Sequence, residues 1–147
     1  MLIKLGTQDV TKLWGELKRA AVASIPPTTS NLEQHTNNVL AAIMRGDIDC
    51  WVIVSREGDP KRAAKGVVFT GLVVDSFSMT KNMLINGVFS YERIDMSLWA
   101  DGLETLRKDA KRKGCHLIIG YTSIPRMIDI VKSLGGNTET TLITLEV

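Results

Sequence analysis

The 147-residue sequence predicts one α/β domain in which helices flank a mixed, mostly antiparallel sheet. Residues 82–121 read as a strand, a helix and a second strand, and a crossover of this length most simply joins parallel neighbours. Three strand-like runs lie between residues 50 and 89, where hairpin pairing is expected. Elsewhere the apolar residues recur at helical spacing.

The first elements are a short strand and a helix. The strand covers residues 1–5 and ends at Gly6, and Thr7 stands where a helix N-cap is expected. Apolar residues then repeat at helical spacing, which predicts one buried face: Val10, Leu13, Trp14, Leu17 and Ala21. Pro26 and Pro27 end this helix, because proline cannot continue it.

The second helix has a capping box at its start. Ser30 is the expected cap and Glu33 stands three residues later. Gly46 ends the helix. His35 lies near the edge of the apolar face, where a structural histidine is the favoured interpretation over a catalytic one.

The central strands are separated by clear turn signals. Residues 50–55 form one strand, and a breaker-rich turn follows at 56–60. Residues 66–75 form the hairpin partner, and Gly71 in its middle predicts a bulge or a close backbone approach. A third strand covers residues 83–89.

Two helices and two strands complete the order β-α-α-β-β-β-α-β-α-β. The third helix runs from about Asp95 to Lys113, and a strand follows over residues 115–119. Ser123 is the expected cap of the fourth helix, which ends at Gly135-Gly136. Residues 141–147 alternate in part and predict the last strand.

Composition excludes few function classes. A net charge of +2 says little about partners. Cys50 and Cys115 lie in apolar strand candidates, so we expect inert core thiols in a reducing, cytoplasmic compartment. His35 and His116 have no Cys or His at ligand spacing, so no metal is expected. No apolar run is long enough for a signal peptide or a membrane span.

The element order and two helix ends resemble the GNAT superfamily of acetyltransferases. Residues 107–115 resemble the helix end before that family's fifth strand, and residues 130–136 resemble its closing helix. The resemblance implies a GNAT-like fold over residues 1–147. It also implies an acetyl-CoA site between splayed fourth and fifth strands. There an Arg/Gln-x-x-Gly-x-Gly/Ala turn binds the pyrophosphate through backbone N–H groups at the third helix's start.

The matching turn departs from that pattern. It lacks glycine in both possible registers, which are Arg93, Met96, Leu98 and Ile94, Ser97, Trp99. Asp95 is expected to cap the helix with its carboxylate, which would occupy N–H groups that a phosphate needs. The resemblance leaves four candidate cofactor contacts: Val88, Phe89, Arg93 and Ser97.

Catalytic candidates are few. The family's fourth-helix tyrosine, an acid for the leaving thiolate, falls at Val131, which has no proton to donate. Tyr121 and Ser123 follow the fifth strand and are possible substitutes, although a packing tyrosine and a helix cap are the plainer interpretations. Glu92, after the fourth strand, is the general-base candidate by position; a solvated carboxylate is the alternative.

Three functions stay open. The first is a GNAT-fold binding or structural subunit with a degenerate acyl-CoA site and a protein partner or homo-oligomer; a phage virion or accessory protein is one form. The second is an active acetyl-CoA-dependent N-acyltransferase acting on an unidentified amine. The third, nucleic-acid binding by the basic residues 107–113, is disfavoured because no aromatic residues interleave with them.

Overall fold

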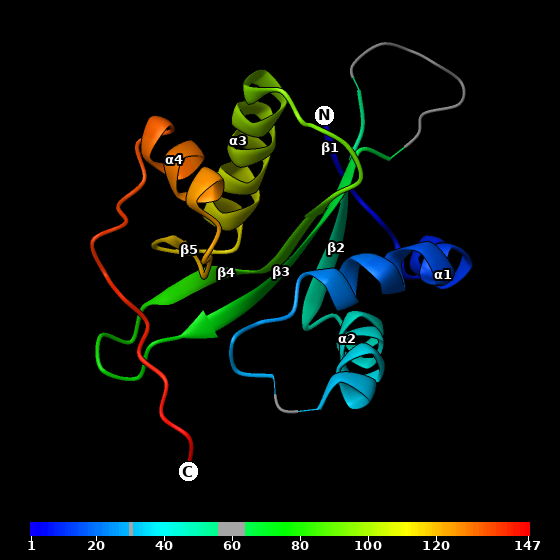
Figure 1. The fold of residues 1–147 in the computed structure, drawn as a ribbon, viewed down its shortest axis with the longest axis horizontal. Coiled ribbons are helices and arrows are strands. Elements are labelled where there is room, and N and C mark those ends of the chain that lie inside the picture. Colours follow the sequence, from blue (N-terminus) through cyan, green and yellow to red (C-terminus); the bar gives the residue numbers. More distant parts are fainter. Residues whose placement is uncertain (30, 56–63) are drawn as a thin grey trace.

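The computed structural model describes residues 1–29, 31–55 and 64–147. Figure 1 shows the elements in chain order: β1 (Leu2–Lys4), α1 (Thr7–Ala23), α2 (Leu32–Arg45), β2 (Ile48–Ile53), β3 (Gly66–Val74), β4 (Lys81–Ser90), α3 (Met96–Arg112), β5 (Ile118–Gly120) and α4 (Pro125–Ser133). The predicted α/β class is confirmed. The predicted cap Ser30 and the turn at 56–60 lie outside the described residues.

The strands form one five-stranded sheet in the order β1-β2-β3-β4-β5. The first three pairings are antiparallel. The pairing of β4 with β5 is parallel, with Met83 opposite Ile118 and Ile85 opposite Gly120. This confirms the parallel step, which arises because a 17-residue helix carries the chain from one strand to the next.

The sheet separates two apolar clusters, with α1 and α2 on one side and α3 on the other (Figure 1). Neighbouring residues of one strand face opposite sides, as the pleat requires. Val67 and Cys50 pack with α1 and α2, whereas Val68 and Trp51 pack with α3. Both sheet faces are therefore buried over β2 and β3, which explains why these strands read as continuous apolar runs.

The starts of α1 and α2 differ from expectation. Gly6 is the N-cap of α1, so Thr7 is its first helical residue and the predicted cap at Thr7 is wrong. A hydroxyl at the first helical position is past the cap geometry and cannot serve the same N–H groups. In α2 the cap is Asn31, whose side-chain oxygen accepts a hydrogen bond from the Gln34 N–H over 3.0 Å.

The predicted last strand is wrong. Residues 141–147 belong to no strand, and most of their side chains are exposed. The neighbouring edge offers little template, because β5 has only three residues in the sheet instead of the predicted five. A lone strand gains no ladder hydrogen bonds, so its alternation alone does not stabilise it.

No helix of the described residues is long and apolar enough to cross a membrane. In the same residues, no three His, Cys, Asp or Glu side chains gather where a metal ion could bind. Both cysteines are free thiols, Cys50 buried and Cys115 partly buried. Burial, helped by the charge of Asp49, raises the pKa of Cys50 to about 12, as expected for an inert core thiol.

Candidate functional site: the divergence of β4 and β5

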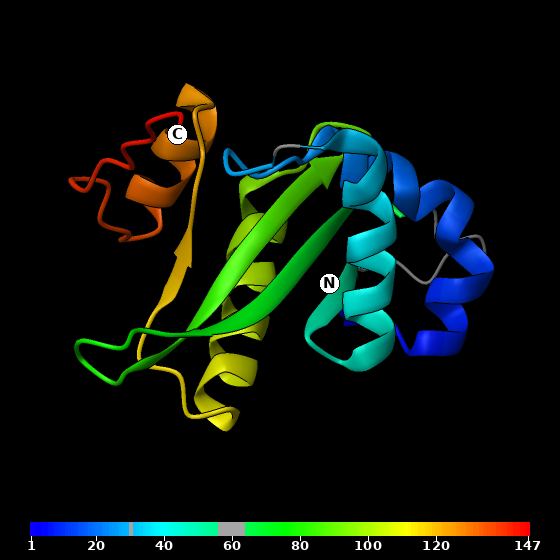
Figure 2. The ribbon, with the colours of Figure 1, turned by 90° about the horizontal axis from the view of Figure 1, so that it is seen from below.

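The candidate site lies where β4 and β5 diverge. Their pairing ends at Ile85 and Gly120, whereas β4 continues to Ser90. Figure 2 shows the chain after β5 leading away from β4 toward α4. Residues 86–90 of β4 therefore have β3 on one edge and no strand of the described chain on the other. Such an edge presents backbone N–H and C=O groups to an extended ligand.

A β-bulge marks the start of this free edge. Phe69 pairs with Gly87 but Thr70 pairs with Ile85, so Asn86 is the extra residue of β4. A bulge bends its strand and increases its twist, which carries β4 away from β5 at this point. The bulge is thus in β4 and not at Gly71. Gly71 does show a close approach, since a Cβ there would lie 2.9 Å from Asn86 Nδ2.

The end of α1 covers one face of β4 beside the bulge. A Cβ at Gly87 would lie 2.8 Å from Ser24 Cβ and 3.0 Å from the Ser24 carbonyl oxygen. Ser24 is the C-cap of α1, and its hydroxyl donates a hydrogen bond to the Ala20 carbonyl over 2.7 Å. Only glycine permits this contact, so Gly87 fixes α1 against β4.

The first turn of α3 lies at the far end of the free edge. Asp95 is its N-cap by backbone geometry, but its carboxylate makes no hydrogen bond to the turn. The backbone carbonyl of Asp95 accepts from the Leu98 and Trp99 N–H groups over 3.0 and 3.1 Å. The prediction that this carboxylate caps the helix is wrong, because the main-chain carbonyl of Asp95, and not its side chain, accepts the hydrogen bonds of the turn.

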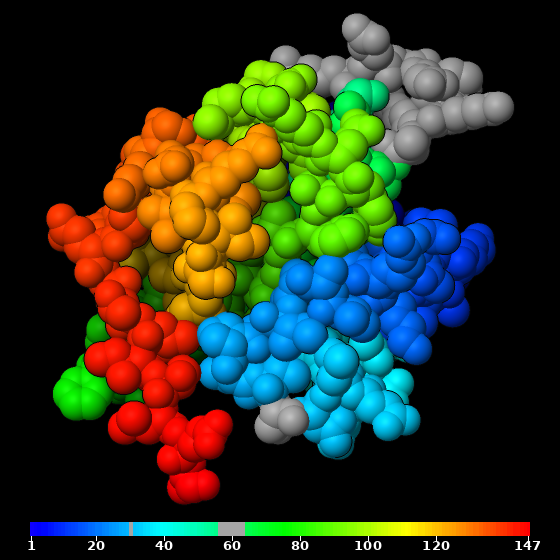
Figure 3. Space-filling model, viewed as in Figure 1, coloured from blue at the N-terminus to red at the C-terminus, as the bar shows by residue number. Residues whose placement is uncertain are grey.

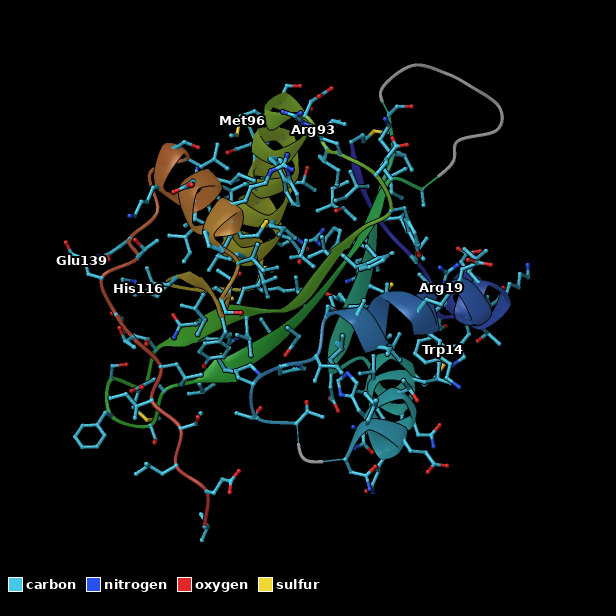
Figure 4. The ribbon with its side chains drawn as sticks, viewed as in Figure 1. Trp14, Arg19, Arg93, Met96, His116 and Glu139 are labelled. Carbon is cyan, nitrogen blue, oxygen red and sulfur yellow. The ribbon has the colours of Figure 1, made fainter. Side chains whose placement is uncertain are left out.

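Met96, the first residue of α3, reaches α4. Its sulfur lies 3.9 Å from the hydroxyl of Ser133, the last residue of α4. The Met96 side chain is 48% exposed, so it stands at the surface between the two helices. Figure 4 shows Met96 and Arg93 at the same end of α3. In the register that starts at Arg93, Met96 is the first of the two positions where the family pattern has a small residue.

The segment between β4 and α3 is held by β3 and the core. The Tyr91 N–H donates to the Lys65 carbonyl over 2.9 Å. Glu92 forms an ion pair with Lys65 at 2.5 Å, and the hydrogen bond from this pair raises the pKa of Lys65. Ile94 is buried in the cluster beneath α3. The carboxylate proposed as a general base is thus engaged with a cation on the β3 side of the sheet.

Two predicted cofactor contacts, Val88 and Phe89, face opposite sides of the sheet. Val88 packs against the α3 cluster, and Phe89 packs against the α1 and α2 cluster. Phe89 also meets Tyr91 edge to face, with ring centroids 5.0 Å apart. Their side chains are therefore used in packing, and only their backbone lies along the free edge.

The predicted contacts Arg93 and Ser97 are both exposed and lie on either side of Asp95, the N-cap of α3. Ser97 is the second helical residue, and Arg93 precedes the N-cap by two residues. This end of a helix carries partial positive charge from its free N–H groups. Arg93 and Ser97 are hence the two predicted residues that could meet an anion here.

Tyr121 lies one residue past the last pairing of β5 with β4, where the free edge starts, and Ser123 follows it along the chain. Tyr121 follows Gly120, the partner of Ile85, and is 52% exposed. Glu92 is seven residues beyond Ile85, which at 3.3 Å per residue is at most about 23 Å for a fully extended chain. Ser123 is exposed and is not the cap of α4. By chain position, Tyr121 and Ser123 thus follow β5 and Glu92 follows the end of β4.

The cap of α4 is Ile124, and the prediction of Ser123 is wrong. Pro125 is the first helical residue and holds Ile124 in an extended conformation. Thr122, and not Ser123, makes the side-chain hydrogen bond at this turn: its hydroxyl accepts from the Ile124 N–H over 3.2 Å. No cap hydrogen bond therefore depends on Ser123, whose exposed hydroxyl faces solvent.

A cavity of about 290 Å³ lies on the α1 and α2 side of the bulge and was missed from the sequence. Its polar lining comes from Ser24, His35, Asn38, Arg45 and Asn86. A ring nitrogen of His35 lies 3.2 Å from the Ala21 carbonyl, which fits the structural role expected for it. The pair Asn86-Gly87 inside an apolar strand was the signal that could have located the bulge and this cavity.

The basic end of α3 takes part in a charge network. Lys113 lies 2.5 Å from Asp49 and 2.6 Å from Asp109, and Arg112 also pairs with Asp109. Lys4 reaches Asp49 over 2.8 Å. Burial alone would raise the pKa of Asp109, but hydrogen bonds from Lys113 and Arg112 lower it below its usual value. Two of the cations predicted as a nucleic-acid patch are thus neutralised within the protein.

Comparison with known proteins shows which fold this architecture belongs to. No family model and no curated protein sequence matches the chain. A probable acetyltransferase superposes with a TM-score of 0.71 at 13% identity over 100% of this chain and 97% of its own. A ribosomal-protein-alanine N-acetyltransferase from Brucella melitensis gives 0.67 at 8% identity over 100% and 99%. A GNAT family acetyltransferase from Staphylococcus aureus gives 0.67 at 12% identity over 100% and 98%. The chain therefore has the GNAT fold.

Proposed function

We propose that this chain keeps the GNAT fold without acyl transfer and acts as a binding or structural subunit. The observation that supports the proposal best is the first turn of α3, which consists of Met96, Ser97 and Leu98. A pyrophosphate must approach the backbone N–H groups of such a turn closely, and small residues permit that approach. Here the long side chain of Met96 reaches Ser133 of α4, with its sulfur 3.9 Å from the Ser133 hydroxyl.

Charge around the turn adds to this argument. Asp95 and Glu92 place two carboxylates within four residues of Met96. Glu92 is paired with Lys65, and the charge of Asp95 is also felt at Lys65, whose pKa it helps to raise. An anionic ligand would meet these carboxylates with Arg93 as its nearest cation in sequence. The two carboxylates thus offset Arg93 and Lys65 and weaken the positive field that favours a pyrophosphate.

The predicted acid and base candidates come from different segments of the described chain. Val131 stands where the GNAT pattern has its tyrosine, and its side chain carries no proton to transfer. Tyr121 and Glu92 are separated by most of the free edge of β4. A general acid and base must reach one reacting centre within hydrogen-bond distance. This separation supports a non-catalytic role.

The direct test is calorimetric titration with acetyl-CoA of the natural chain and of the double variant Met96→Gly/Leu98→Gly. The variant completes an Arg-x-x-Gly-x-Gly turn from Arg93. We expect that the natural chain binds acetyl-CoA with a Kd no lower than about 1 mM. This Kd corresponds to a binding free energy of about −4 kcal/mol. The glycine variant should gain measurable binding if bulky side chains block the turn.

Lys108→Gly/Lys111→Gly is the control for the added glycines; unlike Leu98, which packs against the α3 cluster, both lysines are exposed. It adds two glycines to exposed positions of α3 with a similar loss of helix propensity and leaves the first turn unchanged. Circular dichroism shows whether each variant is folded. Micromolar binding of acetyl-CoA by the natural chain would overturn the proposal.

The second candidate is an active N-acyltransferase with an atypical phosphate turn. Two observations favour it: the free edge at residues 86–90, and the Asp95 carboxylate, which leaves the first-turn N–H groups of α3 unoccupied by its side chain. Acyl transfer needs a positioned thioester and oxyanion support, and backbone N–H groups of β4 could give both. Release of free CoA from acetyl-CoA by the natural chain, with a panel of primary amines, would support this candidate.

A further inference from the structure

A second cavity, of about 400 Å³, lies beside the C-terminal end of α3. Lys113, the C-cap of α3, is one of its lining residues. At 1.5 Å per residue, the 17 residues of α3 put about 25 Å between this cavity and the first turn of the helix. The cavity is therefore separate from the divergence of β4 and β5.

Strands β3 and β4 give the cavity an apolar wall. Leu72 of β3 pairs directly with Met83 of β4, and both residues line the cavity. Directly opposite residues of an antiparallel pair have neighbouring side chains on one face of the sheet. Leu72 is 45% exposed, and Val74, two residues on and on the same face, is 60% exposed. Figure 3 shows the turn after β3 (green, lower left) standing out from the body of the molecule. An apolar strip, Leu72 and Val74, thus leads away from the cavity.

The two lysines of the cavity have more hydrogen-bond donors than their carboxylate partners take up. Lys4 and Lys113 each contact one oxygen of Asp49, over 2.8 and 2.5 Å. Lys113 also contacts Asp109 over 2.6 Å. An ammonium group has three donors. Within the described residues, two donors of Lys4 and one of Lys113 therefore have no protein acceptor.

Thr70 adds a buried donor to the lining. The residue is 2% exposed, and its hydroxyl oxygen accepts a hydrogen bond from the Trp51 indole N–H over 2.9 Å. Its own hydroxyl hydrogen finds no protein acceptor in the part of the chain that the structure describes. A buried donor without an acceptor lowers stability. A ligand that brings an acceptor to Thr70 would remove this cost.

The charge around the cavity is positive. The ion pairs at and behind it join four cations to three acids: Lys4, Arg45, Arg112 and Lys113 to Asp47, Asp49 and Asp109. One positive charge is therefore left over. Lys81 lies beside them, because its Nζ donates to the Lys113 carbonyl over 3.1 Å. Both the free donors and the charge favour an anionic ligand.

We propose that this cavity binds a short aliphatic carboxylate. Its two oxygens accept hydrogen bonds from Lys4, Lys113 and Thr70, and its chain lies along the apolar strip. A carboxylate has lone pairs for several donors, and the chain removes the exposed surface of Leu72 from water. Inorganic phosphate has nothing to place on the strip, and an aliphatic amine would meet the two lysines with like charge.

The first experiment titrates the full ¹⁵N-labelled chain with hexanoate at constant ionic strength. The readout is the indole N–H signal of Trp51, which the variant Trp51→Phe identifies among the signals of the three tryptophans. This signal should shift, because the Thr70 hydroxyl that accepts from the indole turns toward the ligand. We expect saturation with a Kd of about 1 mM, which a ligand of this size can reach.

Two matched probes separate charge from chain. Hexanamide keeps the aliphatic chain and lacks the charge, whereas inorganic phosphate keeps negative charge and lacks the chain. Each should bind at least about tenfold more weakly than hexanoate, because each loses one of the two kinds of contact.

Two variants test the two halves of the cavity. Lys4→Gln should raise the Kd for hexanoate about tenfold, because a charged hydrogen-bond donor is lost. Its control Lys18→Gln removes an exposed lysine of α1, on the other side of the sheet, and should leave the Kd unchanged. Leu72→Ser should raise the Kd about fivefold through lost apolar contact. Its control is Leu13→Ser, which changes a leucine of α1 that is also 45% exposed.

Three results would each overturn the proposal. The first is a Trp51 indole signal that does not shift saturably with hexanoate. The second is an equal Kd for hexanoate and either matched probe. The third is an equal rise in Kd for Lys4→Gln and Lys18→Gln, with circular dichroism showing that both are folded. No measurement here uses acetyl-CoA, so its outcome is independent of the proposed loss of acyl transfer.

Discussion

Replacing Asp109 with asparagine should lower the free energy of unfolding by about 2–3 kcal/mol. Only 4% of the Asp109 side chain is exposed, and it pairs with Lys113 over 2.6 Å and with Arg112. A hydrogen bond between charged groups contributes about 1.5–3 kcal/mol when buried, whereas the exposed Arg112 adds about 0–1 kcal/mol. Lys113 keeps Asp49 as a partner, so the loss stays below that of a fully orphaned charge.

The assay is thermal and urea unfolding of the natural chain, Asp109→Asn and the control Glu104→Gln. Glu104 and Arg107 lie on the same helix at the same three-residue spacing, but are 4.0 Å apart and more than half exposed. Glu104→Gln should lower the free energy of unfolding by less than about 0.5 kcal/mol. Asp109→Asn should lower Tm by about 5–10 °C for a domain of this size.

The stabilisation that Asp109 gains from Lys113 and Arg112 depends on pH. The pKa of Asp109 is lowered in the folded protein, so its stabilisation is present above the unfolded value of about 4 and is lost as pH falls through the folded value. The difference between Asp109→Asn and the natural chain should therefore vanish in strong acid. Equal losses for Asp109→Asn and Glu104→Gln, or a difference that persists in acid, would refute the assigned role of burial.

Two further predictions concern packing and thiol chemistry. Gly87→Ala should lower the free energy of unfolding by about 1–3 kcal/mol, because the new methyl group meets Ser24. The control Gly102→Ala, in open space on α3, should raise it by about 0.5–1 kcal/mol. Urea unfolding measures both changes. Equal changes in stability for the two variants would show that α1 moves to make room for a methyl group at residue 87. Cys50 should resist a thiol reagent at pH 8 until the chain unfolds, since its pKa is about 12, and Cys115→Ser should remove the accessible thiol. Rapid reaction of folded Cys115→Ser would contradict the burial of Cys50.

The order of elements from β1 to α4 could be read from the sequence because each is set by local pattern. Apolar periodicity and glycine or proline breaks located every helix to within a few residues. The parallel step followed from the length of the helix between Met83 and Ile118. These features depend on residues close together in the chain.

The site could be predicted only in part, because its geometry depends on contacts across the chain. Residue type suggested that Asp95 would cap α3, but side-chain rotation decides whether a carboxylate reaches the N–H groups. The network of Asp49, Asp109 and Lys113 joins residues up to 64 positions apart. Residues 141–147 have strand sequence, but a strand needs a neighbour and the sequence does not show which edge is free.

The measurement that tests the loss of acyl-CoA binding most directly is amide exchange and thermal unfolding of the natural chain with acetyl-CoA. We predict no change in Tm and no added protection of residues 94–99 at about 1 mM ligand. A Kd of about 10 μM would instead stabilise the fold by about 2.7 kcal/mol at that concentration. A Tm raised by about 5–10 °C, with slowed exchange at the start of α3, would contradict the account.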